Sequence, residues 1–238
     1  MKRILIAGVV STLLAGAAYA ASAPINAAIA DAGRPATDTA RDANRHPADL
    51  MDFAGIKPGQ QVVDLLPGGG YFTRLFAKTV GTSGHVYALM AKAPNEAFNA
   101  LVAANPNVSV IQSPLDNFKT PQPVDVIWTS DNYHDVHNKG FATDVAAMNK
   151  AIFAALKPGG IYMVIDHRAA KGAGPGATDA LHRTDEDIAK QEILAAGFKL
   201  AAESKILTNP ADDNTKKVFE AGEHDHTDQF VLKFQKPM

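Results

Sequence analysis

Histidine and aspartate residues gather in two short stretches, each of which follows an apolar run. The first stretch, SDNYHDVHN (130–138), contains His134, Asp135 and His137, and the second is DHR (166–168). Imidazole and carboxylate groups can exchange protons near neutral pH or bind a metal ion. Because structural loops seldom need so many titratable groups, these stretches are candidates for a functional site.

A metal ion is one chemistry that these residues allow. His134, His137, Asp166 and His167 offer nitrogen and oxygen ligands to zinc or another divalent ion. The His-x-x-His spacing is much less specific than a double Cys-x-x-Cys, and a surface or helix-capping role is the better explanation for His137 alone. The EHDH stretch (223–226) also has metal-binding residue types, but its composition favours a solvated loop.

A glycine loop lies between a strand-like run and a helical run in VVDLLPGGGYFTRLFA (62–77). Its three glycines allow a ligand to approach the backbone closely and can point N–H groups toward it. Asp64 can orient the loop or bind an ammonium group. Leu66 stands where a nucleotide loop has its first glycine, and Pro67 lacks an N–H donor. The sequence therefore predicts a ligand cleft that binds its ligand more weakly than a typical nucleotide loop does. The alternative is a turn that only packs a helix on a strand.

The elements that must position these groups alternate along the chain. Five strand-like runs are nearly continuous in apolar residues, as is typical of parallel strands buried on both faces; they span 61–66, 85–90, 108–113, 124–130 and 160–166. Helical stretches lie at 71–80, 94–105 and 140–156. A further helix is expected at 184–197, and two more strands at 198–207 and 228–235.

This order predicts an α/β fold with a doubly wound, Rossmann-like sheet of seven mostly parallel strands and an antiparallel last strand. In such a sheet, ligands bind beyond the carboxyl ends of the strands. The glycine loop and both polar stretches should therefore open onto one crevice.

Several motifs resemble those of a known family. The glycine turn after the first strand, LKPGG (156–160) before the fifth and the antiparallel last strand resemble class I S-adenosylmethionine-dependent methyltransferases over residues 47–235. More closely, DLLPGGGYFTRLF, NYHD, LHRTDEDI and NPADDNTKKVF are similar to exported bacterial proteins catalogued as predicted methyltransferases. The resemblance implies a methyltransferase fold with S-adenosylmethionine as the cofactor.

The resemblance also assigns cofactor contacts to the loop and to the end of the second strand. Met90 stands where such enzymes usually place an acidic residue that holds the ribose hydroxyls. The residues expected to bind the cofactor are Asp64, Pro67, Gly68, Gly69, Gly70, Tyr71 and Met90.

The activity implied by the resemblance is methyl transfer to a small molecule. Methyl transfer is an in-line displacement that needs positioning and a base near pH 7. We expect His134 to be that base, with Asp135 or Asp166 orienting its ring. The expected substrate contacts are Tyr133, His137, His167 and Arg45. Two alternatives stay open: a non-catalytic small-ligand-binding module in the periplasm, and a metal-assisted hydrolase or lyase.

The N-terminal residues predict export. Lys2 and Arg3 precede an apolar run and an Ala18-Tyr19-Ala20 cleavage site, so we expect residues 1–20 to be a signal peptide. Residues 21–46 are expected to form an Ala-rich arm that packs over the fold or stays loose, and residues 47–238 to form the main domain. We therefore expect a periplasmic protein with no membrane attachment after cleavage.

Composition limits the partners further. The net charge is −2 with no basic patch, which argues against nucleic acid as a partner. The chain has no cysteine, so an exported form has no disulfides and its stability must come from the core.

Overall fold

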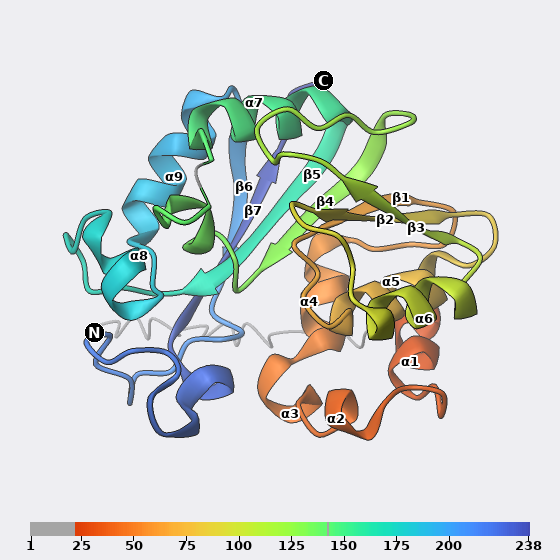
Figure 1. The fold of residues 1–238 in the computed structure, drawn as a ribbon, viewed down its shortest axis with the longest axis horizontal. Helices are drawn as coiled ribbons and strands as arrows, with labels where there is room; N and C mark the ends of the chain where they lie inside the picture. The colour runs from red at the N-terminus through yellow and green to blue at the C-terminus, as the bar shows by residue number, and fades with distance from the viewer. Residues whose placement is uncertain (1–21, 142) are drawn as a thin grey trace, which may run out of the picture.

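The computed structural model of the chain describes residues 22–141 and 143–238 and contains a seven-stranded sheet (Figure 1). The strands lie side by side in the order β3-β2-β1-β4-β5-β7-β6. Their bounds are β1 Gln61–Leu65, β2 His85–Met90, β3 Val108–Gln112, β4 Val124–Ser130, β5 Leu156–His167, β6 Lys199–Ser204 and β7 Gln229–Gln235.

The strand directions confirm the predicted fold. β1 pairs in parallel with β2 and with β4, and the parallel pairing continues to β3 and β5 at either side. β7 lies between β5 and β6 and is antiparallel to both. The chain reverses its winding between β1 and β4, so the carboxyl ends of these two strands flank the position where such sheets bind ligands.

Helices cover both faces of the sheet (Figure 1). Successive side chains of a strand point to opposite faces, so Val62 packs on one side and Val63 on the other. The Val62 face is covered by α4 Pro47–Ala54, α5 Tyr71–Val80 and α6 Glu96–Ala104, and the Val63 face by α7 Val145–Ala155 and α9 Glu186–Ala195. The remaining short elements are α8 Gly176–Leu181 and the 3-10 helices η1 Asp135–His137 and η2 Glu220–His226.

The described part of the N-terminal arm is helical and packed on the domain. It forms α1 Ala23–Ile29, α2 Ala36–Thr39 and α3 Asp42–Arg45. Ile25 and Ala28 of α1 are buried in the same apolar core as α4 and α5. Of the two possibilities expected for the arm, the structure shows the packed one.

The predicted signal peptide, residues 1–20, lies outside the described residues. Across residues 22–141 and 143–238, no helix has both the length and the apolar character needed to cross a bilayer.

Candidate functional site

A polar pocket of about 200 Å³ opens beyond the carboxyl ends of β1 and β4. The glycine loop forms one wall, the residues after β4 form another, and the arm and η2 contribute the rest. The pocket is lined by Asp38, Arg41, Arg45, Asp64, Leu66, Pro67, Gly68, Gly69, Tyr71, Phe72, Ser130, Asp131, Asn132 and His224. Of the residues predicted to bind the cofactor, this pocket includes Asp64, Pro67, Gly68, Gly69 and Tyr71, and Arg45 lines it as well.

A second, more apolar hollow of about 230 Å³ lies on the other side of the loop. Met90 at the end of β2 and Phe141 line it, as the expected cofactor contact at Met90 requires. Both hollows share Leu66, Pro67, Gly68 and Asn132. Asn132 Nδ2 donates a hydrogen bond to Leu66 O at 2.9 Å, which ties the end of β4 to the loop between the hollows.

The loop keeps a glycine-like backbone although its first glycine is replaced. Leu66 has a φ of 55°, in the left-handed region that side chains rarely adopt. A Cβ added at Gly68 or Gly69 would meet no atom within 4 Å, so both residues face open space. At Gly70 an added Cβ would lie 2.4 Å from Leu101 Cδ1, so this glycine serves close packing with α6 and does not line either hollow.

Asp64 is the second-last residue of β1, and this buried residue lines the polar pocket. Thr73 Oγ1 donates a hydrogen bond to Asp64 Oδ2 at 2.6 Å. Burial raises the pKa of Asp64 to about 7, although this hydrogen bond and the charge of Arg45 act in the opposite direction. The group is therefore poised between its charged and neutral forms at neutral pH.

Arg45 is the main contact between the arm and the strand ends. Its Nη2 atom donates hydrogen bonds to Asp131 Oδ2 at 2.7 Å and to Ser130 Oγ at 3.0 Å. Its guanidinium carbon lies 4.6 Å from the centroid of the Tyr71 ring. Tyr71 in turn donates to Asp42 Oδ1 at 2.6 Å. Arg45 and Tyr71 both line the polar pocket.

His134 and Asp166 form a buried ion pair away from the pocket. His134 Nδ1 lies 2.7 Å from Asp166 Oδ1, and neither residue lines the polar pocket. Burial alone would lower the pKa of His134, but the charge of Asp166 and the hydrogen bond raise it to about 9. Asp135 lies 3.4 Å from His134 Nε2 on the other side of the ring.

This arrangement corrects the expectation that His134 is a base near pH 7. A histidine that is protonated at neutral pH has no lone pair with which to accept a proton. The pair instead joins the residues after β4 to the end of β5.

Tyr133 and His137 also lie away from the pocket, contrary to the expectation that they contact substrate. The Tyr133 side chain is fully buried, donates to Glu192 Oε2 and accepts from Asn149 Nδ2, both at 2.9 Å. His137 Nε2 lies 3.1 Å from the same Glu192 carboxylate. Four residues separate the end of β4 from η1, and the two rings contact Glu192 of α9, with Tyr133 also contacting Asn149 of α7.

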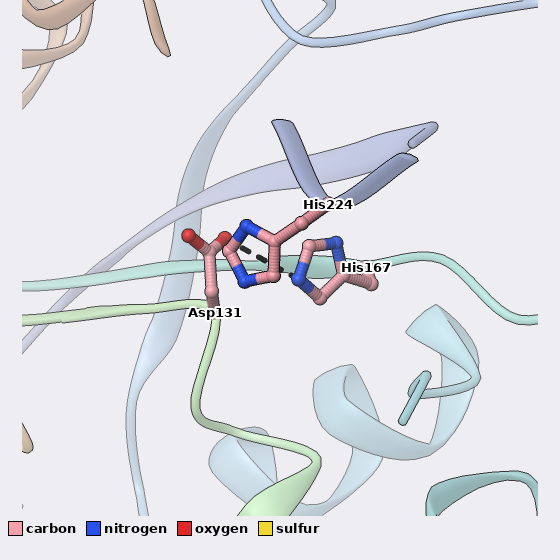
Figure 2. Close-up of side chains that lie close together, drawn as sticks. All are labelled: Asp131, His167 and His224. Atoms are coloured by element: carbon pink, nitrogen blue, oxygen red, sulfur yellow. Dashed lines mark ion pairs between the residues drawn. The ribbon is translucent and has the colours of Figure 1, made fainter. Parts of the chain in front are cut away.

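His167, an expected substrate contact, does not line the polar pocket and lies beside Asp131 and His224 (Figure 2). Its ring is fully buried, and Nε2 lies 4.0 Å from Asp131 Oδ1. Asp131, His167 and His224 each offer a ligand atom, and these atoms lie within 4.8 Å of one another. Among the described residues, this is the group with a metal-ligand arrangement, and it includes only His167 of the four residues predicted as ligands.

The structure adds residues that the sequence did not assign to the site. Asp131 follows β4 with a φ of 60°, and His224 belongs to η2, in the stretch expected to be a solvated loop. Asp38 comes from the arm. No spacing in the sequence links these segments, because they meet only through the fold.

Comparison with known proteins finds similarity to methyltransferases. No protein-family model matches the sequence. The Ubiquinone/menaquinone biosynthesis C-methyltransferase UbiE of Vibrio campbellii is 30% identical over 129 residues, which cover 49% of this chain and 44% of that protein. The UbiE of Hydrogenovibrio crunogenus is 28% identical over 185 residues, which cover 72% and 68%. The chain thus spans less than half the length of the Vibrio relative.

Solved structures share the fold at low sequence identity. An S-adenosylmethionine-dependent methyltransferase from Mesorhizobium loti matches with a TM-score of 0.58 and 19% identity, over 82% of this chain and all of that one. The [4+2]-cyclase SpnF matches with a TM-score of 0.61 and 14% identity, over 87% and 84%. The fold alone therefore hosts more than one chemistry.

Proposed function

We propose that the chain, which is similar to S-adenosylmethionine-dependent methyltransferases in sequence and in fold, binds S-adenosylmethionine at the glycine loop and transfers a methyl group to a small molecule. The observation that carries the proposal is the loop itself, which lies between a polar pocket and an apolar hollow. A cofactor with a charged amino-acid end and a purine end needs two such neighbouring environments.

The residues around the loop fit the two ends of this cofactor. Arg41 and Arg45 bring positive charge to the polar pocket for a carboxylate, and Asp64 brings a carboxyl group for an ammonium. The hollow beside Met90 and Phe141 suits a purine ring. Gly68 and Gly69 leave the open space through which a ligand can approach the backbone.

One departure from the family pattern is expected to weaken the binding of S-adenosylmethionine. Met90 cannot accept hydrogen bonds from ribose hydroxyls as a carboxylate does. Hydrogen bonds to charged groups contribute about 1.5–3 kcal/mol each, so the affinity is expected to be about 10- to 100-fold lower than with an acidic residue at this position.

Bound S-adenosylmethionine would supply an electrophilic methyl group. The chain's own residues would hold and orient the reactants, which is the main requirement of an in-line displacement. We assign contact with the acceptor to the wall formed by Asp131, Asn132 and His224, because these residues line the polar pocket opposite the loop. The relatives' C-methyltransferase name makes a carbon atom of a small molecule a reasonable acceptor to test.

We also propose that the protein acts in the periplasm after removal of residues 1–20. The support is the charged start, the apolar run and the Ala-x-Ala site. Cell fractionation with N-terminal sequencing of the mature chain tests this part independently. An uncleaved chain in the cytoplasmic fraction would contradict it.

Isothermal titration with S-adenosylmethionine and with its demethylated product tests the function. We expect saturable binding of both, and Gly69→Val should weaken it at least about tenfold, or 1.4 kcal/mol, by filling the ligand's space. The matched control is Gly176→Val, which also meets no neighbouring atom but lies outside both hollows. No binding of either compound at millimolar concentration would end the proposal. Binding without turnover of any offered acceptor would favour the non-catalytic module.

A further inference from the structure

Asp131, His167 and His224 come from three distant segments and lie close together (Figure 2). Asp131 follows β4, His167 ends β5 and His224 belongs to η2. We infer that these three side chains form a binding site for a divalent metal ion of the zinc type. The proposed methyl transfer needs no metal ion, although Asp131 and His224 also belong to the wall assigned to the acceptor, so a metal ion at this site would be an additional ligand of the same pocket.

Two buried atoms of the group have no hydrogen-bond partner. They are Asp131 Oδ1 and His167 Nε2, which lie 4.0 Å apart. That separation is too long for a hydrogen bond between them. Leaving a polar atom buried and unpaired costs about 1–3 kcal/mol, so a third species that bonds both atoms would stabilise the site.

The opposite ring nitrogen of His167 is already held. Its Nδ1 lies 2.6 Å from Thr227 Oγ1, and that hydroxyl donates in turn to His224 O at 3.4 Å. An Nδ1–H group that donates to Thr227 leaves the lone pair of Nε2 directed at Asp131. Metal-bound histidines usually have such an outer hydrogen-bond partner, which fixes the ring and its tautomer.

The other two side chains are held in a similar way. Arg45 Nη2 donates a hydrogen bond to Asp131 Oδ2 at 2.7 Å, so Asp131 Oδ1 is left for a second partner. His224 Nδ1 lies 3.2 Å from Asp225 Oδ1, and Asp225 is bound through both oxygens by Arg41 at 2.6 Å. All three candidate ligands are therefore oriented by neighbours that do not compete for the space between them.

The donor set selects the class of ion. Two imidazoles and one carboxylate suit zinc and other first-row divalent metals, whereas magnesium and calcium prefer oxygen ligands only. Donors on one zinc ion lie roughly 3–3.5 Å apart, so the three atoms would move together by about 1 Å on binding. The three protein ligands leave a coordination position open, and it faces the polar pocket because Asp131 and His224 line that pocket.

Metal titration of the untagged full chain, freed of metal by a chelator, tests the inference. The probes are Zn²⁺ by isothermal titration and Co²⁺ by its visible absorption bands, both without S-adenosylmethionine. We expect one ion per chain and cobalt bands typical of four or five ligands. Since no cofactor is present, a negative result here is distinct from a failure of the methyltransferase proposal.

Substitutions distinguish this site from incidental binding by histidines. His224→Ala and Asp131→Asn should each weaken Zn²⁺ binding by about 100-fold, and Thr227→Val by about 10- to 100-fold as an outer partner. The control is His226→Ala, on the same segment but outside the group, which should bind as the original chain does. Absence of saturable binding, or an equal loss in His224→Ala and His226→Ala, would overturn the inference.

Discussion

Leu66 has a left-handed backbone conformation that favours glycine, yet it carries a large apolar side chain. Its φ of 55° is one that glycine adopts freely and that costs other residues about 1–2 kcal/mol. Its side chain also lines both hollows beside the loop. Residues held in rare backbone regions often lie at functional sites, and Asp131 across the pocket, with a φ of 60°, is a second example.

We predict that Leu66→Gly tightens the binding of S-adenosylmethionine about tenfold, because removing the side chain joins the two hollows. The free energy of unfolding should change by less than about 1 kcal/mol, since relief of backbone strain offsets the lost packing. Isothermal titration and denaturant unfolding measure the two effects. Leu66→Ala separates them, because it removes the side chain but keeps the strain; unchanged or weaker affinity in both variants would contradict the prediction.

At the scale of elements, the buried ion pair between His134 and Asp166 holds the residues after β4 next to the end of β5. Asp166 at the end of β5 accepts hydrogen bonds from the backbone and the ring of His134 and from Thr184 Oγ1. Burial alone would raise the pKa of Asp166, but the His134 charge and hydrogen bond lower it below its usual value. The pair is therefore charged at neutral pH and holds the residues after β4 against β5.

We predict that His134→Ala destabilises the fold by about 3–5 kcal/mol, because it leaves the Asp166 charge buried without its partner. Denaturant unfolding at pH 7 measures the loss, and the double variant with Asp166→Asn shows how much of it is coupling between the two groups. The exposed His226→Ala should stay within about 0.5 kcal/mol. A His134→Ala protein of unchanged stability that has lost turnover would restore His134 as a catalytic base.

The sequence predicted the elements of the sheet far better than the orientation of its polar residues. The five apolar runs match β1 to β5 closely, because a strand buried on both faces has little freedom in composition. The arm helices α2 and α3 have four residues each and no apolar face, and ion pairs such as Arg74 with Asp38 attach α2 to the domain. Nothing local in the sequence indicates such contacts.

The candidate site was predicted only in part, for a related reason. The loop residues and Arg45 line the expected pocket, since their position follows from the strand–loop–helix order. Tyr133 and His137 turn inward because η1 begins at Asp135, a turn that the residue types do not reveal. His224 lies at the site because η2 shortly precedes antiparallel β7, and the first residue of β7, Gln229, pairs with His167 at the end of β5.

At the scale of the whole molecule, buried groups with shifted pKa values make stability depend on pH. Burial lowers the pKa of His167 from 6.5 to about 4, which raises stability as pH rises between these values, whereas Asp64 and His134 act in the opposite direction. The pKa of Asp64 rises from 3.8 to about 7 on folding, and that of His134 from 6.5 to about 9. Both groups hold a proton more tightly in the folded chain. Their contribution to stability is therefore complete at low pH and is lost as pH rises, for Asp64 between about 4 and 7 and for His134 between about 6.5 and 9.

We predict that the free energy of unfolding falls between pH 5 and pH 8, and that Asp64→Asn reduces this fall by more than about 1 kcal/mol. The amide keeps the shape of the side chain but cannot ionise. Denaturant unfolding at the two pH values, for both chains, provides the measurement. A fall of the same size in both would show that the Asp64 carboxyl does not titrate in this range.

The ion pair between Arg41 and Asp225 joins residues 184 positions apart, one on the arm and one on η2. Both of these segments supply walls of the polar pocket. A chain still emerging from the ribosome therefore has no finished pocket until residues 224 and 225 have been made. A chain truncated before residue 224 would keep the glycine loop, the arm and the residues after β4, but it would lack the wall that η2 supplies.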